Sequence, residues 1–127
     1  MKFKNNTIQI ACDGGAATGK TTGAKLLAKK YGLSFLSSGL LYRYASYLIL
    51  KYRPKNKILF LKKRYKNLNY KKLSKINLHT PKISSHSSEI AKMLSIRNIL
   101  KKYQIEFIKK NKFCVLEGRD SGTKIMR

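Results

Sequence analysis

Gly14 to Thr21 read GGAATGKT, which fills every fixed position of the phosphate-binding signature Gly-x-x-x-x-Gly-Lys-Thr. The apolar run from Ile8 to Cys12 precedes this stretch, and residues 24–31 follow it with helical spacing. A strand, a loop and a helix in that order are the context that the signature requires. The sequence therefore predicts an anion-binding loop inside an α/β fold.

The residue types in this loop suit a polyphosphate and a divalent cation. Gly14 and Gly19 let the backbone curl, so that successive N–H groups point at phosphate oxygens. Lys20 supplies a positive charge for the β- and γ-phosphates, and the hydroxyl of Thr21 is placed to ligate Mg²⁺. The helix that begins here adds the positive end of its dipole to the same site.

The chain is short and strongly basic. Its 127 residues allow one domain or part of one, and 29 Lys and Arg against five acids give a formal charge of +24. A solvated lysine-rich surface and a surface that binds polyanions both explain this charge. Because charge alone is a weak signal, we do not expect nucleic acid to be the main partner.

The five acids are Asp13, Glu89, Glu106, Glu117 and Asp120. Three of them, Asp13, Glu117 and Asp120, lie beside the phosphate-binding loop or in the segment LEGRD. In a chain with so few carboxylates, we interpret these three as functional, and Glu89 and Glu106 as structural.

Neither the cysteines nor the histidines have the spacing of a metal site. Cys12 and Cys114 lie in apolar runs, where cysteine usually acts as a small hydrophobic residue, and no disulfide is implied. The apolar run near the N-terminus is too short for a signal peptide, and no stretch approaches the length of a membrane span. We expect a cytoplasmic protein without a membrane partner.

Apolar runs and helical spacing alternate along the chain. Strands are predicted at residues 7–12, 34–36 and 113–116. Helices are predicted at residues 19–31, 39–51 and from about 84 to 110. Gly32 is placed to cap the first helix in the left-handed conformation, and Pro54 to end the second. Residues 51–76 carry eleven basic residues and no acid, and we expect them to be mobile or partly helical.

This alternation favours a parallel sheet, in which ligands bind at the carboxyl ends of the strands. Three segments would follow those ends: the phosphate-binding loop, Ser37 to Gly39, and Glu117 to Asp120. We therefore expect three segments that are distant in sequence to face one crevice.

Three motifs in this order carry a family resemblance: ACDGGAATGKT at 11–21, SSGLLYR at 37–43 and LEGRDSGT at 116–123. Together they resemble bacterial cytidylate kinase, a P-loop nucleoside monophosphate kinase, from about Ile8 to Thr123. The resemblance implies a P-loop kinase α/β fold with a parallel sheet, truncated after the third strand. It divides the chain into a core with the phosphate loop at 1–50, a lysine-rich acceptor-binding insert at 51–83, and a helix and third strand at 84–127.

The resemblance also implies ATP and Mg²⁺ as cofactors, CMP or dCMP as acceptor, and a role for each matching residue. The residues expected to hold the ATP phosphates are Gly14, Gly15, Ala16, Ala17, Thr18, Gly19, Lys20, Thr21 and Thr22. Those expected to hold Mg²⁺ are Thr21, Asp13 and Glu117. Those expected to bind the acceptor are Ser38, Tyr42, Arg43, Ser88, Arg97, Arg119 and Asp120. Lys20, Arg43 and Arg119 would be catalytic, Ser88 and Arg97 would read the cytosine ring, and Asp120 would accept from its amino group.

The chain departs from the family pattern at several positions. Gly15 replaces a proline, Ser37 replaces an acid, and His79 stands at a basic position. The family also continues beyond Arg127 with further strands and an arginine-rich lid. We therefore expect an open apolar edge at Ile8 to Cys12 and little kinase activity from this chain alone. A complementing C-terminal fragment is a candidate partner.

Other interpretations stay open at this point. Tyr42 could be a packing residue, Ser88 and Arg97 ordinary helix residues, and Arg119 with Asp120 a local ion pair in a turn. The protein could be another small-molecule P-loop kinase, an inactive nucleotide-binding remnant, or a basic nucleic-acid-binding module. Strongly salt-dependent binding of DNA or RNA that excess CMP does not affect would favour the last of these.

Overall fold

A computed structural model gives the arrangement of the chain and describes residues 2–4, 7–12, 26, 28–111 and 113–117. The contacts divide the chain into two compact units. The first comprises Met1–Gly39 with Gln104–Arg127, and the second comprises Leu40–Tyr103. We call them the sheet unit and the helical unit.

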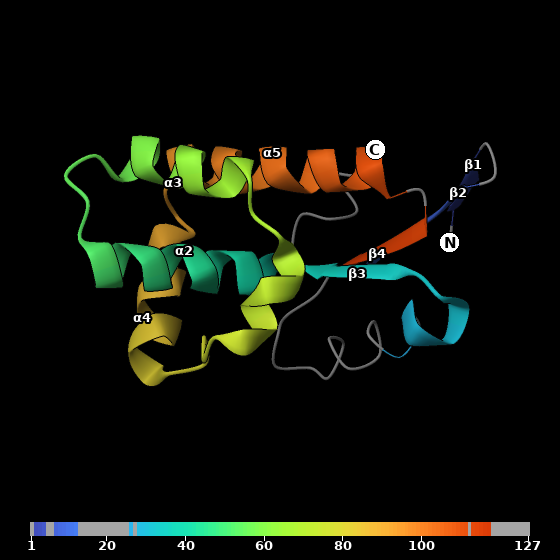
Figure 1. Cartoon of the computed structure of the whole chain (residues 1–127), viewed down its shortest axis with the longest axis horizontal. Coiled ribbons are helices and arrows are strands. Elements are labelled where there is room, and N and C mark those ends of the chain that lie inside the picture. Colours follow the sequence, from blue (N-terminus) through green and yellow to red (C-terminus); the bar gives the residue numbers. More distant parts are fainter. Residues whose placement is uncertain (1, 5–6, 13–25, 27, 112, 118–127) are drawn as a thin grey trace. The chain divides into compact units, whose positions relative to one another are not determined.

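The sheet unit contains a four-stranded sheet with the order β1-β2-β4-β3. Its strands are β1 (Lys2–Lys4), β2 (Thr7–Cys12), β3 (Ser34–Ser37) and β4 (Phe113–Glu117). The strands β2, β4 and β3 run parallel, and β1 pairs with β2 in the antiparallel sense. Figure 1 shows β3 and β4 side by side, although about 80 residues separate them in the chain. The predicted small parallel sheet is confirmed, and its three strands lie where the apolar runs placed them.

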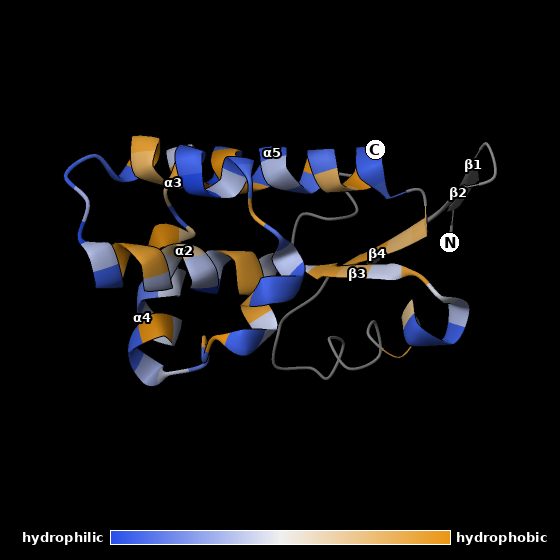
Figure 2. Cartoon of the chain, in the orientation of Figure 1, coloured by the Kyte–Doolittle hydropathy of each residue, from blue (hydrophilic) through white to orange (hydrophobic). Residues whose placement is uncertain are grey.

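Strand β4 is the buried centre of this sheet. Cys114, Val115, Leu116 and Glu117 are all buried, as is Leu36 in β3. Four consecutive buried residues mean that both faces of the strand are covered, which is typical of a parallel strand with neighbours on either side. Figure 2 accordingly shows the apolar colour on β4 and on part of β3.

The short strand β1 corrects one of our expectations. We expected β2 to have an open edge on the side away from β4. Instead β1 pairs with the first half of that side, in the register Lys2 to Gln9, Phe3 to Ile8 and Lys4 to Thr7, while no described strand pairs there with residues 10–12, so the expectation is corrected only in part. The sequence contained a signal that we missed. Asn5 and Asn6 alone separate the two strands, and a two-residue spacer with Asn is typical of a hairpin.

The first predicted helix lies partly outside the described residues, but its end is visible. Residues 26 and 28–31 are helical, and Gly32 follows with a φ of 66°. The N–H of Leu33 donates to the carbonyl of Ala28, and the N–H of Gly32 donates to that of Lys29. This pair of bonds is a Schellman motif, which confirms the predicted glycine cap.

The helical unit begins within α2 (Ser38–Tyr52), the second predicted helix. Leu41, Ala45 and Leu48 form its buried stripe. The helix ends at Tyr52, and Arg53 takes a left-handed φ of 44° immediately before Pro54. Pro54 stops the helix as predicted, because the residue before a proline is disfavoured in the helical conformation.

The lysine-rich segment forms α3 (Lys57–Lys66) and the 3₁₀ helix η2 (Tyr70–Lys75). Asn56 and Asn69 cap them, each accepting a backbone N–H through its side chain. Leu61, Tyr65 and Leu73 are buried and hold these helices to the unit. Of the two expectations for this segment, mobile or partly helical, the second is confirmed. That residues 51–83 form an acceptor-binding insert stays a prediction.

The third predicted helix proved to be two helices, α4 (Pro81–Ile90) and α5 (Leu94–Lys110). The buried residues of α4 include Ile83 and Ile90, and those of α5 include Ile96 and Leu100. In one continuous helix these two stripes would lie about 110° apart around the axis, so they could not both face the same core. The break at 91–93 lets both stripes pack inward. No Gly or Pro marks this break, which is why the sequence did not reveal it.

Candidate nucleotide site

The three parallel strands end together at one edge of the sheet unit. Cys12 in β2 and Ser37 in β3 both pair with Glu117 in β4, and each is the last residue of its strand. The phosphate-binding loop follows Cys12 in sequence, and Ser38 follows Ser37. The register therefore brings together the strand ends from which all three predicted site segments depart.

Glu117 is the central described group at this edge. Its side chain is 4% exposed, and the hydroxyl of Ser37 donates a hydrogen bond of 2.7 Å to its Oε2. A buried carboxylate requires such a donor, because burial removes its hydration. Ser37 stands where the family resemblance implies an acid, and a hydroxyl supplies the hydrogen bond that a second carboxylate would not.

A carboxylate at this place suits a magnesium ion. Mg²⁺ prefers oxygen ligands and usually keeps several waters. Glu117 offers a carboxylate at the strand end, directly beside the point from which Asp13 and the phosphate-binding loop continue. Within the described residues, no group of three His, Cys, Asp or Glu side chains forms a complete metal site. The described residues alone therefore do not complete a metal site at this edge.

The remaining predictions for this edge concern residues outside the described ranges. They are Asp13, Gly14, Gly15, Ala16, Ala17, Thr18, Gly19, Lys20, Thr21, Thr22, Arg119 and Asp120. Ser38 is described. It is buried and is the first residue of α2, directly after the hydroxyl that bonds Glu117.

Arg43 lies in the helical unit and is held by two acceptors. Its Nη1 donates to the carbonyl of Leu78 at 3.1 Å and to the hydroxyl of Ser84 at 2.6 Å. Ser84 was not among our candidate residues. Its contact joins α2 to α4 across 41 positions of sequence, and no local pattern in the chain marks it.

Ser88 shares this neighbour with Arg43. Its hydroxyl is exposed and donates to the backbone carbonyl of Ser84 at 3.2 Å. Two residues that we predicted to bind the acceptor therefore both hydrogen-bond to Ser84, Arg43 to its hydroxyl and Ser88 to its backbone carbonyl. Tyr42 and Arg97 are half-buried in the helical unit, and His79 is exposed before α4 begins.

The structure also locates one of the two cysteines and tests the described helices for membrane spans. Cys114 is fully buried in β4, and burial raises the pKa of its thiol to about 11, so its reactive thiolate is scarce at neutral pH. None of the described helices combines the length and the apolar character that spanning a bilayer demands.

Comparison with known proteins then decides the family. The sequence profile described as cytidylate kinase matches residues 10–127, which is nearly the whole chain. The chain belongs to the cytidylate kinase family. A cytidylate kinase from Thermosipho melanesiensis is 38% identical over 128 residues. Others, from Rickettsia canadensis and Aquifex aeolicus, are 32% and 30% identical over 125 and 131 residues.

These alignments cover most of this chain but only part of each relative. They span 93%, 95% and 94% of the chain, but 58%, 55% and 59% of the three relatives respectively. The chain therefore corresponds to somewhat more than half of a cytidylate kinase. The resemblance drawn from the three sequence motifs is confirmed by both kinds of comparison.

Proposed function

We propose that this chain carries the nucleotide-binding part of a kinase that transfers the γ-phosphoryl group of ATP to CMP or dCMP. The observation that carries the proposal is the alignment of Cys12, Ser37 and Glu117 at one edge of the sheet. It supports a site in which the phosphate-binding loop and a buried carboxylate serve the same nucleotide. Family membership supports the choice of acceptor.

Phosphoryl transfer depends mainly on positioning and on charge neutralisation. In our proposal Lys20 and the backbone of Gly14 to Thr22 hold the ATP phosphates. Asp13, Thr21 and Glu117 would hold Mg²⁺, which when bound neutralises charge that builds up on the phosphates. Arg43 and Arg119 would grip the acceptor phosphate, since an arginine fork binds two oxygens at once.

The acceptor base would be read by groups that complement cytosine. Its amino group is a donor, and its N3 and O2 are acceptors. The carboxylate of Asp120 suits the donor, while Arg97 and the hydroxyl of Ser88 suit the acceptors. Ser38 and Tyr42 would complete the acceptor site.

Complete turnover would also require the remainder of the family's sequence. The chain spans 55–59% of the three relatives compared, and the resemblance places an arginine-rich lid in the remainder. We propose that a segment of that kind, in the same or in a separate chain, completes the active site.

The choice of base gives a direct test of the acceptor. UMP presents a carbonyl where CMP presents its amino group, so it would leave the carboxylate of Asp120 unpaired. We expect CMP to bind more tightly than UMP by about 1–3 kcal/mol, and Asp120→Ala to abolish this preference. Isothermal titration calorimetry with both nucleotides measures it, and Glu89→Ala, which removes an exposed acid, is the matched control.

Two results would count against this acceptor. Equal affinities for CMP and UMP would remove the base-reading role. Binding of an oligonucleotide with steep salt dependence, which excess CMP did not displace, would instead indicate a nucleic-acid-binding module.

A further inference from the structure

The guanidinium of Arg43 is held on one side only. An arginine has five N–H donors, and both donors of Nη1 are accounted for by the Leu78 carbonyl and the Ser84 hydroxyl. Among the described residues, no partner is recorded for its Nε or Nη2, and no carboxylate pairs with it. The single acid between residues 40 and 103 is Glu89, which is exposed.

The two acceptors are themselves fixed within the helical unit. Leu78 is fully buried, and α4 begins with a Thr80 cap whose hydroxyl accepts the N–H of Ile83 at 3.2 Å. Ser46 of α2 is also fully buried and contacts α4 twice, at the Ile83 carbonyl and at Nδ1 of His86, the latter at 2.7 Å. The residues that Ser46 contacts, Ile83 and His86, flank Ser84 in α4. The position of Ser84 relative to α2, and hence to Arg43, is therefore fixed.

An arginine held in this way is oriented before any ligand arrives. The Nε and Nη2 donors lie on one edge of the planar group and match two oxygens of a phosphate. A long, rotamer-rich side chain normally loses conformational freedom when it binds, and holding Nη1 in advance reduces that loss. Neutral acceptors hold it here, so its full positive charge remains for an anion.

We propose that Ser84, together with the Leu78 carbonyl, positions Arg43 so that its Nε–Nη2 edge binds the phosphate of the acceptor nucleotide. This inference rests on the proposed function, in which Arg43 contacts that phosphate. In this proposal Ser84 acts through Arg43 and is therefore a positioning residue. It is therefore a determinant of phosphate affinity that family motifs in the sequence do not mark.

Comparing CMP with cytidine, which lacks the phosphate, isolates this role. We expect Ser84→Ala to weaken CMP binding about 3- to 10-fold and to leave cytidine binding unchanged. Ser84→Thr, which keeps the hydroxyl, should restore CMP affinity. Arg43→Lys keeps the charge but loses the fork, so it should weaken CMP at least as much as Ser84→Ala. Ser85→Ala, an exposed position on the same helix, is the control.

A merely structural Ser84 would give other results. If Ser84→Ala weakened CMP and cytidine equally, or if neither changed, the positioning role would be overturned. If the unmodified chain bound neither ligand, the proposed function would fail, and with it the contact between Arg43 and phosphate.

The effect of Ser84 on the Arg43 guanidinium can also be measured in the absence of a nucleotide. Rotation about the Nε–Cζ bond of Arg43, measured by side-chain ¹⁵N exchange in NMR, should be slow in the unmodified chain and faster in Ser84→Ala. Equal rotation rates would show that Ser84 does not hold the guanidinium.

Discussion

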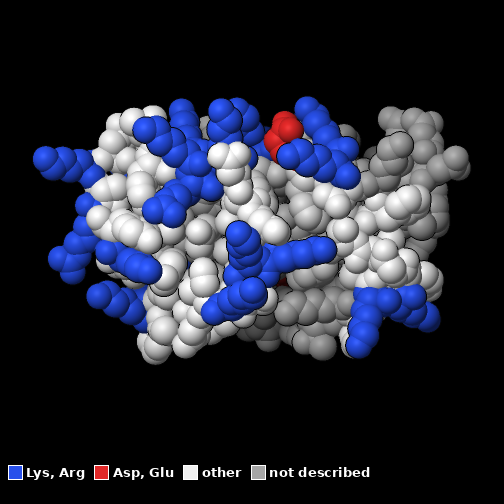
Figure 3. All heavy atoms as spheres, in the orientation of Figure 1, with Lys and Arg blue, Asp and Glu red and all other residues white. Residues whose placement is uncertain are grey.

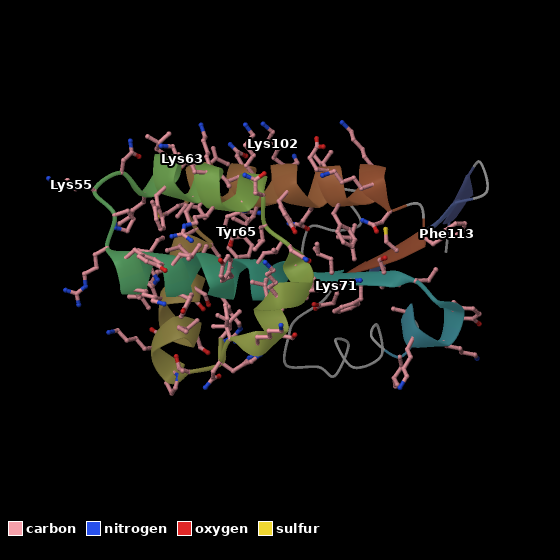
Figure 4. All side chains as sticks on the ribbon, viewed as in Figure 1. Lys55, Lys63, Tyr65, Lys71, Lys102 and Phe113 are labelled. Carbon is pink, nitrogen blue, oxygen red and sulfur yellow. The ribbon has the colours of Figure 1, made fainter. Side chains whose placement is uncertain are left out.

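Tyr65 shows how much a single side chain contributes to the helical unit. It is 3% exposed, and its hydroxyl donates a hydrogen bond of 2.6 Å to the carbonyl of Leu41 in α2. Its ring packs edge-on against Tyr103 of α5 and tilted against Tyr44 of α2. Figure 4 shows Tyr65 pointing into the unit, whereas Lys63 and Lys102 point away from it. One aromatic residue thus links α3 to both of its neighbours.

This burial predicts a loss of stability at alkaline pH. Burial, and then the neighbouring tyrosines Tyr44 and Tyr103, raise the pKa of Tyr65 well above its usual value of 10.0. The folded state therefore favours the neutral phenol. The corresponding stabilisation is complete below about pH 10 and is lost as the pH rises from there through the folded-state pKa.

Urea unfolding at pH 8 and at pH 11 measures this loss. The unmodified chain should lose more stability between the two pH values than Tyr65→Phe, which has no phenol to ionise. Tyr31→Phe removes an exposed tyrosine as a control and should behave like the unmodified chain. A Tyr65→Phe variant with the same pH dependence as the unmodified chain would contradict the account.

At the scale of elements, replacing Gly32 and Gly39 by alanine should change the stability of the chain in opposite directions. Gly32 has a φ of 66° after the first helix, and an added Cβ would meet no atom within 4 Å. The left-handed conformation alone should therefore make Gly32→Ala destabilising, by about 1 kcal/mol.

Gly39 lies inside α2 with ordinary backbone, and an added Cβ would meet only the Ser37 hydroxyl, at 3.7 Å. Gly39→Ala should stabilise the chain by up to about 0.5 kcal/mol, because alanine favours the helix. Thermal unfolding of both variants compares the signs directly. A stabilising Gly32→Ala would mean that the helix does not end in the left-handed cap.

The elements also show what the sequence could and could not reveal. The strands followed from short apolar runs, and Gly32 and Pro54 marked helix ends through their own backbone restrictions. Strand β1 was missed because its three residues carry little apolar pattern by themselves, and only the Asn5-Asn6 spacer pointed to a hairpin. The break between α4 and α5 depends on which side each isoleucine stripe faces, which tertiary packing decides. The contact of Ser84 with Arg43 is likewise tertiary.

At the scale of the whole molecule, the positive charge is concentrated in the helical unit. Residues 40–103 carry seventeen Lys and Arg and one acid. Figure 3 shows positive side chains over much of the face drawn and few negative ones. The described ion pair between Lys109 and Glu106 lies in the sheet unit, is 3.8 Å long and is exposed, so it offsets little of this charge. Such a surface attracts anions of any kind, and the site residues must supply the selectivity.

Titration with a fluorescent ATP analogue, with and without Mg²⁺, is the most direct test that the strand ends build a nucleotide site. Lys20→Ala should weaken binding about 10- to 100-fold through the lost charge on the phosphates. Glu117→Gln keeps an acceptor for the Ser37 hydroxyl, so the fold should persist while the gain in affinity from Mg²⁺ shrinks. Lys109→Ala, an exposed lysine, should change neither. Equal affinities in all four proteins would show that the charge of the chain, and not this site, binds the nucleotide.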